Sequence, residues 1–280
     1  MRAMARINEM AGRSESGHKH GVMPTWPDGV RAIPNILLRS PLFAALGRGT
    51  RNYMKREEIV CLGDVKVRYT GAQLDQWDLS VWMAVLHIAR QQTIDGVACR
   101  TTAYQLLKLL GRTDSGKNRE ILQQRLSVLS ATAVEIEIAK FSFEGSLIDE
   151  ATRADVRAAD GSRAYSILLN PTITRLFVED TTWISWGVRN ELNSQPLAQW
   201  LHCFYATHKQ PFALKISTLH SLCGSESRCL RDFTKNLRRS LSAVRSASMQ
   251  HGATFDWRVD SNSGLVHVSR KLSTSKSTSK

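Results

Sequence analysis

The chain has 280 residues, of which 42% are hydrophobic and 22% are charged, as in an ordinary globular protein. Lys and Arg number 38 against 25 Asp and Glu, which gives a formal net charge of +13. This excess predicts a polyanionic partner, either nucleic acid or an anionic membrane surface. A membrane protein is not expected, because the longest apolar run, residues 81–89, is too short to span a bilayer and no secretory signal follows Met1.

Composition divides the chain into four segments. Residues 1–24 lack hydrophobic periodicity and are expected to be a disordered N-terminal segment, whereas the basic, low-complexity residues 271–280 predict a flexible tail. Two stretches with similar patterns lie between them. We therefore expect two domains, at residues 25–169 and 170–270.

The first of these domains is predicted to contain three helices followed by a β-hairpin. Apolar residues at helical spacing indicate the helices, and an alternating pattern indicates an earlier hairpin within residues 59–71. Two further strands, at 134–143 and 165–170, are expected to pair across a long polar tip. The predicted helices span residues 74–91, 102–110 and 117–130. This is the element order of a winged helix, which contains a helix-turn-helix motif.

The turn between the last two helices, residues 111–118, reads GRTDSGKN and fits the phosphate-loop pattern G-x-x-x-x-G-K except at Asn118. A phosphate loop requires a Ser or Thr hydroxyl there for magnesium, and it must follow a buried strand. The residues before Gly111 instead have helical spacing, with Thr101 or Thr102 as the expected N-cap. We therefore expect a polar turn between two helices rather than a nucleotide site.

The second domain is predicted to repeat this order. Residues 217–224 are expected to form a short helix that begins at Ser217 and ends at Gly224, and a long helix should follow over residues 226–248. The other expected elements are short and longer helices at 170–177 and 195–209, a strand at 211–216, and a hairpin of strands 254–260 and 264–270. The predicted fold class is therefore α+β, with two tandem winged-helix domains.

The long helix of the second domain has a strongly basic side. Its apolar residues fall on one side of a helical wheel, and its basic residues fall on the other. The alternative is a solvated surface, but such surfaces usually mix charges of both signs. We therefore favour a DNA-binding surface. The apolar residues are Leu230, Phe233, Leu237, Leu241 and Val244; the basic residues are Arg228, Arg231, Lys235, Arg238, Arg239 and Arg245.

Each candidate residue has an expected role in DNA binding. The N-terminal part of the long helix is expected to enter the major groove, where Arg228, Arg231 and Lys235 would read bases. The later residues Arg238, Arg239 and Arg245 would hold phosphates. The last hairpin would add Arg258, Arg270 and Lys271, and the turn and helix start of the first domain would add Arg112, Lys117, Asn118 and Arg119.

Catalytic, metal and cofactor sites are not expected. The histidines are not paired with a nucleophile motif, and the possible zinc ligands Cys203, His208, His220, Cys223 and Cys229 lack zinc-finger spacing. The number of cysteines is five, which is odd, and they contain no C-x-x-C pair. This cysteine pattern favours a reducing cytoplasm. Because no catalytic motif is found, the protein is not expected to be an enzyme.

Several short motifs, in their order and spacing, carry a family resemblance over roughly residues 24–270. They are Trp26-Pro27-Asp28, Arg31 to Asn35, Tyr69-Thr70-Gly71, Arg125-Leu126 with Ala131 to Ala133, Phe204-Tyr205, His208, Pro211-Phe212, Leu214-Lys215, and Cys223 to Ser227. With these motifs the sequence resembles the TrfA-type replication initiators of broad-host-range plasmids, which are tandem winged-helix proteins.

The resemblance implies binding to direct repeats (iterons) in double-stranded plasmid origin DNA, opening of an adjacent A·T-rich segment, and recruitment of host DnaA and replicative helicase. It also implies self-association and a cytoplasmic, plasmid-associated location. Two rival functions remain. One is a winged-helix transcriptional repressor, which the same basic helix would suit, and the other is an ATP-dependent enzyme that uses residues 111–118.

Overall fold

The computed structural model describes residues 24–47, 49, 51–63, 65–92, 98–138, 141–157 and 163–271. The predicted disordered segment at 1–24 and the predicted tail at 271–280 lie outside these residues, except for Pro24 and Lys271.

A single buried helix, α3 (Gln76–Ala89), forms the centre of the first half of the molecule. Its side chains are buried almost all the way round, which explains why apolar residues occur on every side of this segment. Asp75 caps its first turn by accepting from the backbone N–H groups of Trp77 and Asp78. The elements around it are β1 (Val30–Pro34), α2 (Asn35–Leu38), β2 (Phe43–Ala44), β3 (Tyr53–Ile59), β4 (Lys66–Ala72), β5 (Leu74–Asp75), β6 (Ala98–Thr102), α4 (Ala103–Leu109) and α5 (Gly116–Ser130).

The helix pair α4 and α5, here called the first helix pair, forms as the sequence predicts. Thr102 and Gln105 make a capping box at the start of α4, and Ser115 caps α5 by accepting from the N–H of Asn118. Gly111 has φ of 64°, the left-handed conformation that favours glycine just after a helix. The segment 111–115 is thus a turn between two helices, and the helix α4 rather than a strand precedes it.

The predicted strand pairing of the first half is wrong. The segment 134–143 forms two strands, β7 (Ala133–Ile138) and β8 (Phe141–Gly145), in an antiparallel four-stranded sheet of order β3-β4-β7-β8. The supposed polar tip contains β9 (Ile148–Arg157), which pairs with β10 (Arg163–Leu169). Most of the described side chains of β9 are exposed, so this strand lacks the apolar alternation that would have identified it.

The second half contains α8 (Pro196–Ala206) and a further helix pair, here called the second helix pair: α9 (Ile216–Leu222) and α10 (Leu230–Gln250). The expected helix at 226–248 therefore begins four residues later than predicted, and Arg228 precedes it. Ser217 is not the N-cap of α9, because Lys215 holds that position and makes no side-chain cap. The strands of this half are β12 (Leu214–Lys215), β13 (Thr254–Val259) and β14 (Leu265–Lys271).

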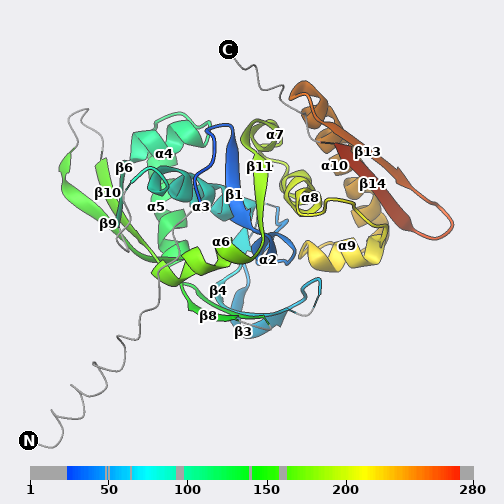
Figure 1. Cartoon of the computed structure of the whole chain (residues 1–280), viewed down its shortest axis with the longest axis horizontal. Coiled ribbons are helices and arrows are strands. Elements are labelled where there is room, and N and C mark those ends of the chain that lie inside the picture. Colours follow the sequence, from blue (N-terminus) through cyan, green and yellow to red (C-terminus); the bar gives the residue numbers. More distant parts are fainter. Residues whose placement is uncertain are drawn as a thin grey trace, which may run out of the picture.

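Both halves place their helix pair against a three-stranded antiparallel sheet of the same connectivity. The strand orders are β6-β10-β9 and β12-β14-β13, so in each half the first strand pairs with the last. The β7–β8 hairpin is an insertion in the first half, between α5 and β9. The two long hairpins, β9–β10 and β13–β14, lie at opposite ends of the molecule (Figure 1).

The two halves meet through a short connecting region. It contains η1 (Pro171–Arg175), α6 (Leu176–Glu179), β11 (Thr181–Ser185) and α7 (Trp186–Glu191). Strand β11 pairs antiparallel with β1, so the start of the described chain is joined to the region that precedes α8. Buried apolar residues form one cluster from Trp26 to Trp186 that also includes Cys203, and a second cluster from Val188 to Val268.

The motif Trp26-Pro27-Asp28 holds the N-terminal strand against α3. Nε1 of Trp26 donates to Nδ1 of His87 at 3.1 Å, and Asp28 forms an ion pair with Arg90. Desolvation by burial, followed by the charges of Arg31 and Arg90, lowers the pKa of His87 to about 4. Trp26 is therefore part of the core packing, whereas Pro27 and Asp28 are exposed at its edge.

Candidate nucleic-acid interface

Helix α10 has one buried side and one basic, exposed side. The buried side consists of Phe233, Leu237, Leu241 and Val244, which pack against α8 and β13. Of the apolar residues that the wheel assigns to this side, Leu230 is the exception, because 47% of it is exposed. The opposite side presents cations to solvent over the whole length of the helix, as the sequence predicts.

Four of these cations make no side-chain hydrogen bond or ion pair within the part of the chain that the structure describes. They are Arg228, Arg231, Lys235 and Arg238, all of them exposed. The other two have weak partners. Arg239 donates to Oδ1 of Asn236 at 2.8 Å, and Nη2 of Arg245 lies 3.2 Å from Oδ1 of Asp256, with both side chains more than half exposed. An exposed pair of this kind contributes little to stability.

The turn before α10 is held rigidly against the first half. Gly224 has φ of 62°, and a Cβ there would lie 2.8 Å from Cβ of Ala44. The N–H of Ala45 donates to the carbonyl of Cys223 at 2.7 Å. On the far side of the turn, Nε2 of His220 lies 2.9 Å from the carbonyl oxygen of Ser227. These contacts fix the direction in which the N-terminus of α10 points.

The residues predicted on the last hairpin have different environments. Arg258 and Lys271 are exposed on β13 and β14. Arg270 points inward instead, and its Nη1 donates to the carbonyls of Tyr205, Ala206 and His208 at the end of α8. Burial lowers the pKa of Arg270 from its ordinary value. Arg270 thus satisfies the last carbonyls of a helix, a role that the sequence did not indicate.

In the first helix pair most of the predicted residues already have protein partners. Arg119 forms a bidentate ion pair with Asp114, with both N–O distances at 2.5 Å. Nη2 of Arg112 donates to Oδ1 of Asn193 at 2.9 Å, and Nδ2 of Asn118 donates to the carbonyl of Thr113 at 2.8 Å. Lys117 is exposed and makes no ion pair with a described residue.

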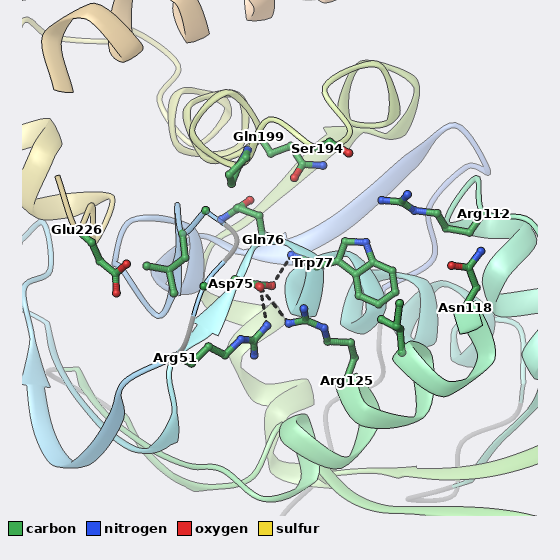
Figure 2. Close-up of a pocket in the computed structure, with 15 residues that line it drawn as sticks. Arg51, Asp75, Gln76, Trp77, Arg112, Asn118, Arg125, Ser194, Gln199 and Glu226 are labelled. Carbon is green, nitrogen blue, oxygen red and sulfur yellow. Dashed lines mark hydrogen bonds and ion pairs between the residues drawn. The ribbon is translucent and has the colours of Figure 1, made fainter. Parts of the chain in front are cut away.

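A hollow of about 590 Å³ lies between the first helix pair, α8 and the turn before α10 (Figure 2). Arg112 and Asn118 line it from the first pair, Glu226 lines it from the turn before α10, and Gln199 lines it from α8. Trp77 lies in the wall beneath Arg112, with the guanidinium carbon 5.8 Å from the ring centroid. The first helix pair, α8 and the turn before α10 therefore face one concavity, although about a hundred positions of sequence separate Asn118 from Glu226.

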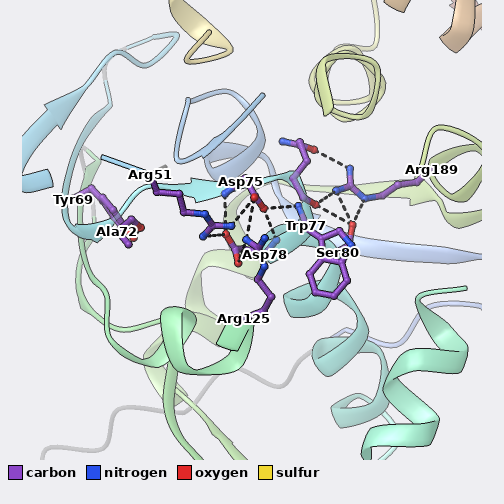
Figure 3. Close-up of polar contacts among 10 residues, drawn as sticks. Arg51, Tyr69, Ala72, Asp75, Trp77, Asp78, Ser80, Arg125 and Arg189 are labelled. Atoms are coloured by element: carbon purple, nitrogen blue, oxygen red, sulfur yellow. Dashed lines mark hydrogen bonds and ion pairs between the residues drawn. The ribbon is translucent and has the colours of Figure 1, made fainter. Parts of the chain in front are cut away.

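A compact ion-pair network forms one wall of this hollow (Figure 3). Arg51 and Arg125 each contact both Asp75 and Asp78, at N–O distances of 2.5 to 3.3 Å. Asp78 is completely buried, so these two guanidinium groups supply the counter-charge that its burial requires. Arg125 belongs to α5, and the network thereby fastens α5 to the start of α3.

The junction between the halves contains a buried guanidinium, that of Arg189 on α7. It is 1% exposed and donates to the carbonyl of Gln76 at 2.8 Å and to Oγ of Ser80 at 3.0 Å (Figure 3). Its Nη1 also lies 3.0 Å from Sγ of Cys203. No carboxylate contacts it within the described residues. Neither Arg189 nor the network of Asp75 and Asp78 was predicted from the sequence. The spacing D-x-x-D at the start of a helix could have indicated the N-cap of α3.

The described residues contain neither a membrane-spanning helix nor a metal site. Across the residues that the structure covers, no helix is long and apolar enough to cross a membrane. In the same residues no group of three or more His, Cys, Asp or Glu side chains is arranged to hold a metal ion.

The fold as a whole is similar to domains 2 and 3 of RctB. Two crystal structures of those domains superpose with TM-scores of 0.59 and 0.53, covering 85% and 80% of this chain and 98% and 93% of the RctB chains. Sequence identity is 13% and 15%, so this similarity concerns the α+β fold alone.

The family is shown by the sequence itself. The family model described as "TrfA protein" matches residues 19–270, and the chain therefore belongs to the TrfA family. The plasmid replication initiator protein TrfA of Escherichia coli is 29% identical over 253 residues, which cover 88% of this chain. The match spans 63% of that relative, so it covers less than two thirds of the relative's length.

Proposed function

We propose that this protein initiates plasmid replication by binding direct repeats in double-stranded origin DNA, with α10 as the helix that reads them. The single observation that supports this most is the exposed side of α10 together with the turn before it, where four cations, Arg228 in the turn and three on the helix, make no ion pair within the described residues. Clustered like charges repel one another, and phosphate groups relieve that repulsion. Membership of the TrfA family supports the same function.

The shared connectivity of the two halves supports the finer proposal that each is a winged helix. In each half a strand, a helix pair and a two-stranded hairpin follow one another, and the first strand pairs with the last. The hairpin beside α10 would then be a wing whose exposed residues Arg258 and Lys271 contact the DNA backbone. Arg270 is left out of this surface, because its guanidinium is occupied by the carbonyls at the end of α8.

Docking would follow the geometry of a recognition helix. The N-terminus of α10 enters the major groove, where Arg231 and Lys235 reach base edges and Arg228 approaches from the turn. Arg238, Arg239 and Arg245 lie further along the helix and would hold phosphates. Opening the adjacent DNA would draw on the energy of these contacts, against a bending cost of order 1 to 6 kcal/mol.

The first helix pair would make a smaller contribution. Among the residues predicted there to contact DNA, Lys117 is exposed, makes no ion pair with a described residue and stands at the start of α5. Arg112, Asn118 and Arg119 already have protein partners. We therefore expect them to make only weak contacts with the DNA backbone as it passes the turn.

The wider proposal concerns partners. We expect host DnaA and replicative helicase to be recruited in the bacterial cytoplasm, with self-association of the chain, and we expect no enzymatic activity and no cofactor. A transcriptional repressor, including one that represses its own gene and so sets plasmid copy number, would use the same basic helix. Plasmid maintenance in trans separates the two functions, because only an initiator supports it.

A gel-shift titration tests the central claim. The full chain is titrated against a duplex that carries the repeats of its plasmid origin and against a scrambled duplex, at two salt concentrations. Stepwise complexes on the repeats, weakened by Arg231→Ala, are the expected result. Equal affinity for both duplexes with a steep salt dependence would mean that the protein coats DNA without reading it.

A further inference from the structure

Leu230, the first residue of α10, is exposed where the periodicity of the helix predicts burial. The other apolar residues on its side of the helix, from Phe233 to Val244, are no more than 1% exposed, whereas Leu230 is 47% exposed. Leu230 is more exposed because it lies beyond the end of the second apolar cluster, to which it does not belong. An apolar side chain is thus presented at the tip of the helix rather than packed beneath it.

The neighbours of Leu230 are polar or charged and lie open to solvent. Cys229 and Arg231, on either side of it, are both exposed, and so is Arg228. Neither arginine makes an ion pair with a described residue. A single exposed leucine is ordinary on a protein surface. This one, however, lies at the end of the helix from which Arg231 would reach base edges, directly after the turn in which Gly224 packs against Ala44 and His220 contacts Ser227.

From this placement we infer that Leu230 contacts the 5-methyl group of a thymine in the major groove, beside the base that Arg231 reads. The inference rests on the proposed function. The major-groove edge of an A·T pair carries one apolar group, the thymine methyl, and apolar side chains recognise it by contact. Arg231 binds the O6 and N7 acceptors of guanine in the same groove. The preferred site therefore contains a thymine within a base step or two of a guanine.

The DNA is varied first, because that test does not depend on the folding of any variant. The full chain selects its preferred duplex from a random library, and each thymine of that duplex is then replaced singly by uracil, which lacks only the methyl group. We expect one replacement to weaken binding by about fourfold, the effect of losing one buried methyl group, and the others to have little effect.

The protein is varied next, with a matched control on the same helix. Leu230→Ala should bind the thymine duplex more weakly than the wild type does. The variant should bind the thymine duplex and the sensitive uracil duplex with equal affinity. Met249→Ala removes the apolar side chain at the other end of α10, which is 63% exposed and about 28 Å away along the helix. It should retain the full preference for thymine.

The outcomes separate this inference from the proposed function. If the wild-type chain prefers its selected duplex to a scrambled one but tolerates every uracil replacement, Leu230 does not read thymine and the proposed function is unaffected. The same conclusion follows if Leu230→Ala keeps the preference for thymine. If the chain selects no preferred duplex at all, the proposed function fails, and this inference fails with it.

Discussion

The two helix pairs share a connectivity but differ in what their cations contact. In the first pair, Arg119 is bound by Asp114, and Arg125 is bound by Asp75 and Asp78. In the second pair, Arg231 and Arg238 make no ion pair within the described residues. Similar counts of basic residues thus have different consequences. Arg119 and Arg125 of the first pair hold the protein together, whereas Arg231 and Arg238 of the second are available to a partner.

The largest effect is expected at the junction on which both pairs depend. Arg189→Ala leaves the carbonyl of Gln76 and the hydroxyl of Ser80 without their buried donor and opens a cavity. We expect a loss of about 3 to 5 kcal/mol in the free energy of unfolding, measured by urea titration, as for other large buried side chains. Arg238→Ala, on the exposed side of α10, is the control and should change stability by less than about 0.5 kcal/mol. Equal stability of the two variants would show that the junction is unimportant.

Acid should weaken the first half through His87. The pKa of His87 is lowered to about 4 by burial and by two arginines, whereas an unfolded histidine titrates near its ordinary value of 6.5. The unfolded state therefore binds more protons between these values, and stability is lost as pH falls from about 6.5 to about 4, by up to about 3 kcal/mol.

Chemical denaturation at several pH values measures this effect. His87→Gln removes one titrating group and should make the loss of stability in that window smaller. A remaining loss is expected from His202, because burial lowers the pKa of that side chain to about 3. A variant as acid-sensitive as the wild type would assign the pH dependence to another group.

Replacing one arginine of each helix pair by alanine shows which pair contacts DNA. Arg231→Ala should cost about 1 to 3 kcal/mol in binding to the preferred duplex and relax the choice of base at one position. Arg119→Ala should cost less than about 0.5 kcal/mol, because Asp114 already neutralises that guanidinium. Isothermal titration with matched and single-mismatch duplexes gives both values. If Arg119→Ala weakens binding more than Arg231→Ala does, the first helix pair rather than the second reads the DNA.

The smallest effect concerns phosphate contacts. Arg238→Ala should reduce the slope of log K against log salt by about one, which is the signature of one lost phosphate contact. Arg112→Ala should leave the slope nearly unchanged, since its guanidinium is held by Asn193 and lies over Trp77. Fluorescence anisotropy over a range of potassium chloride concentrations resolves a change of this size. Equal changes in slope for Arg238→Ala and Arg112→Ala would mean that both helix pairs contact the DNA phosphates.

Helices were predicted better than strands, for a physical reason. The ends of α3, α4 and α5 lie within two residues of the predicted ones, because helical periodicity and caps are set by neighbours in the sequence. The pairing of β9 with β10, and of β7 with β4 and β8, depends on contacts between distant segments. Local alternation cannot reveal such contacts, and the pairing of 134–143 with 165–170 was wrong for that reason.

The sequence by itself determined the amphipathic character of α10, the turn at Gly111 and the excess of positive charge, because each of these follows from residue type and local spacing. Only the tertiary structure decided which charges remain available. Arg125 meets Asp75 across fifty positions of sequence, Arg270 turns inward to the end of α8, and Leu230 reaches solvent because the core ends beneath it. A charge or an apolar side chain acquires its role from the partner that folding brings to it, and that partner is rarely a neighbour in the chain.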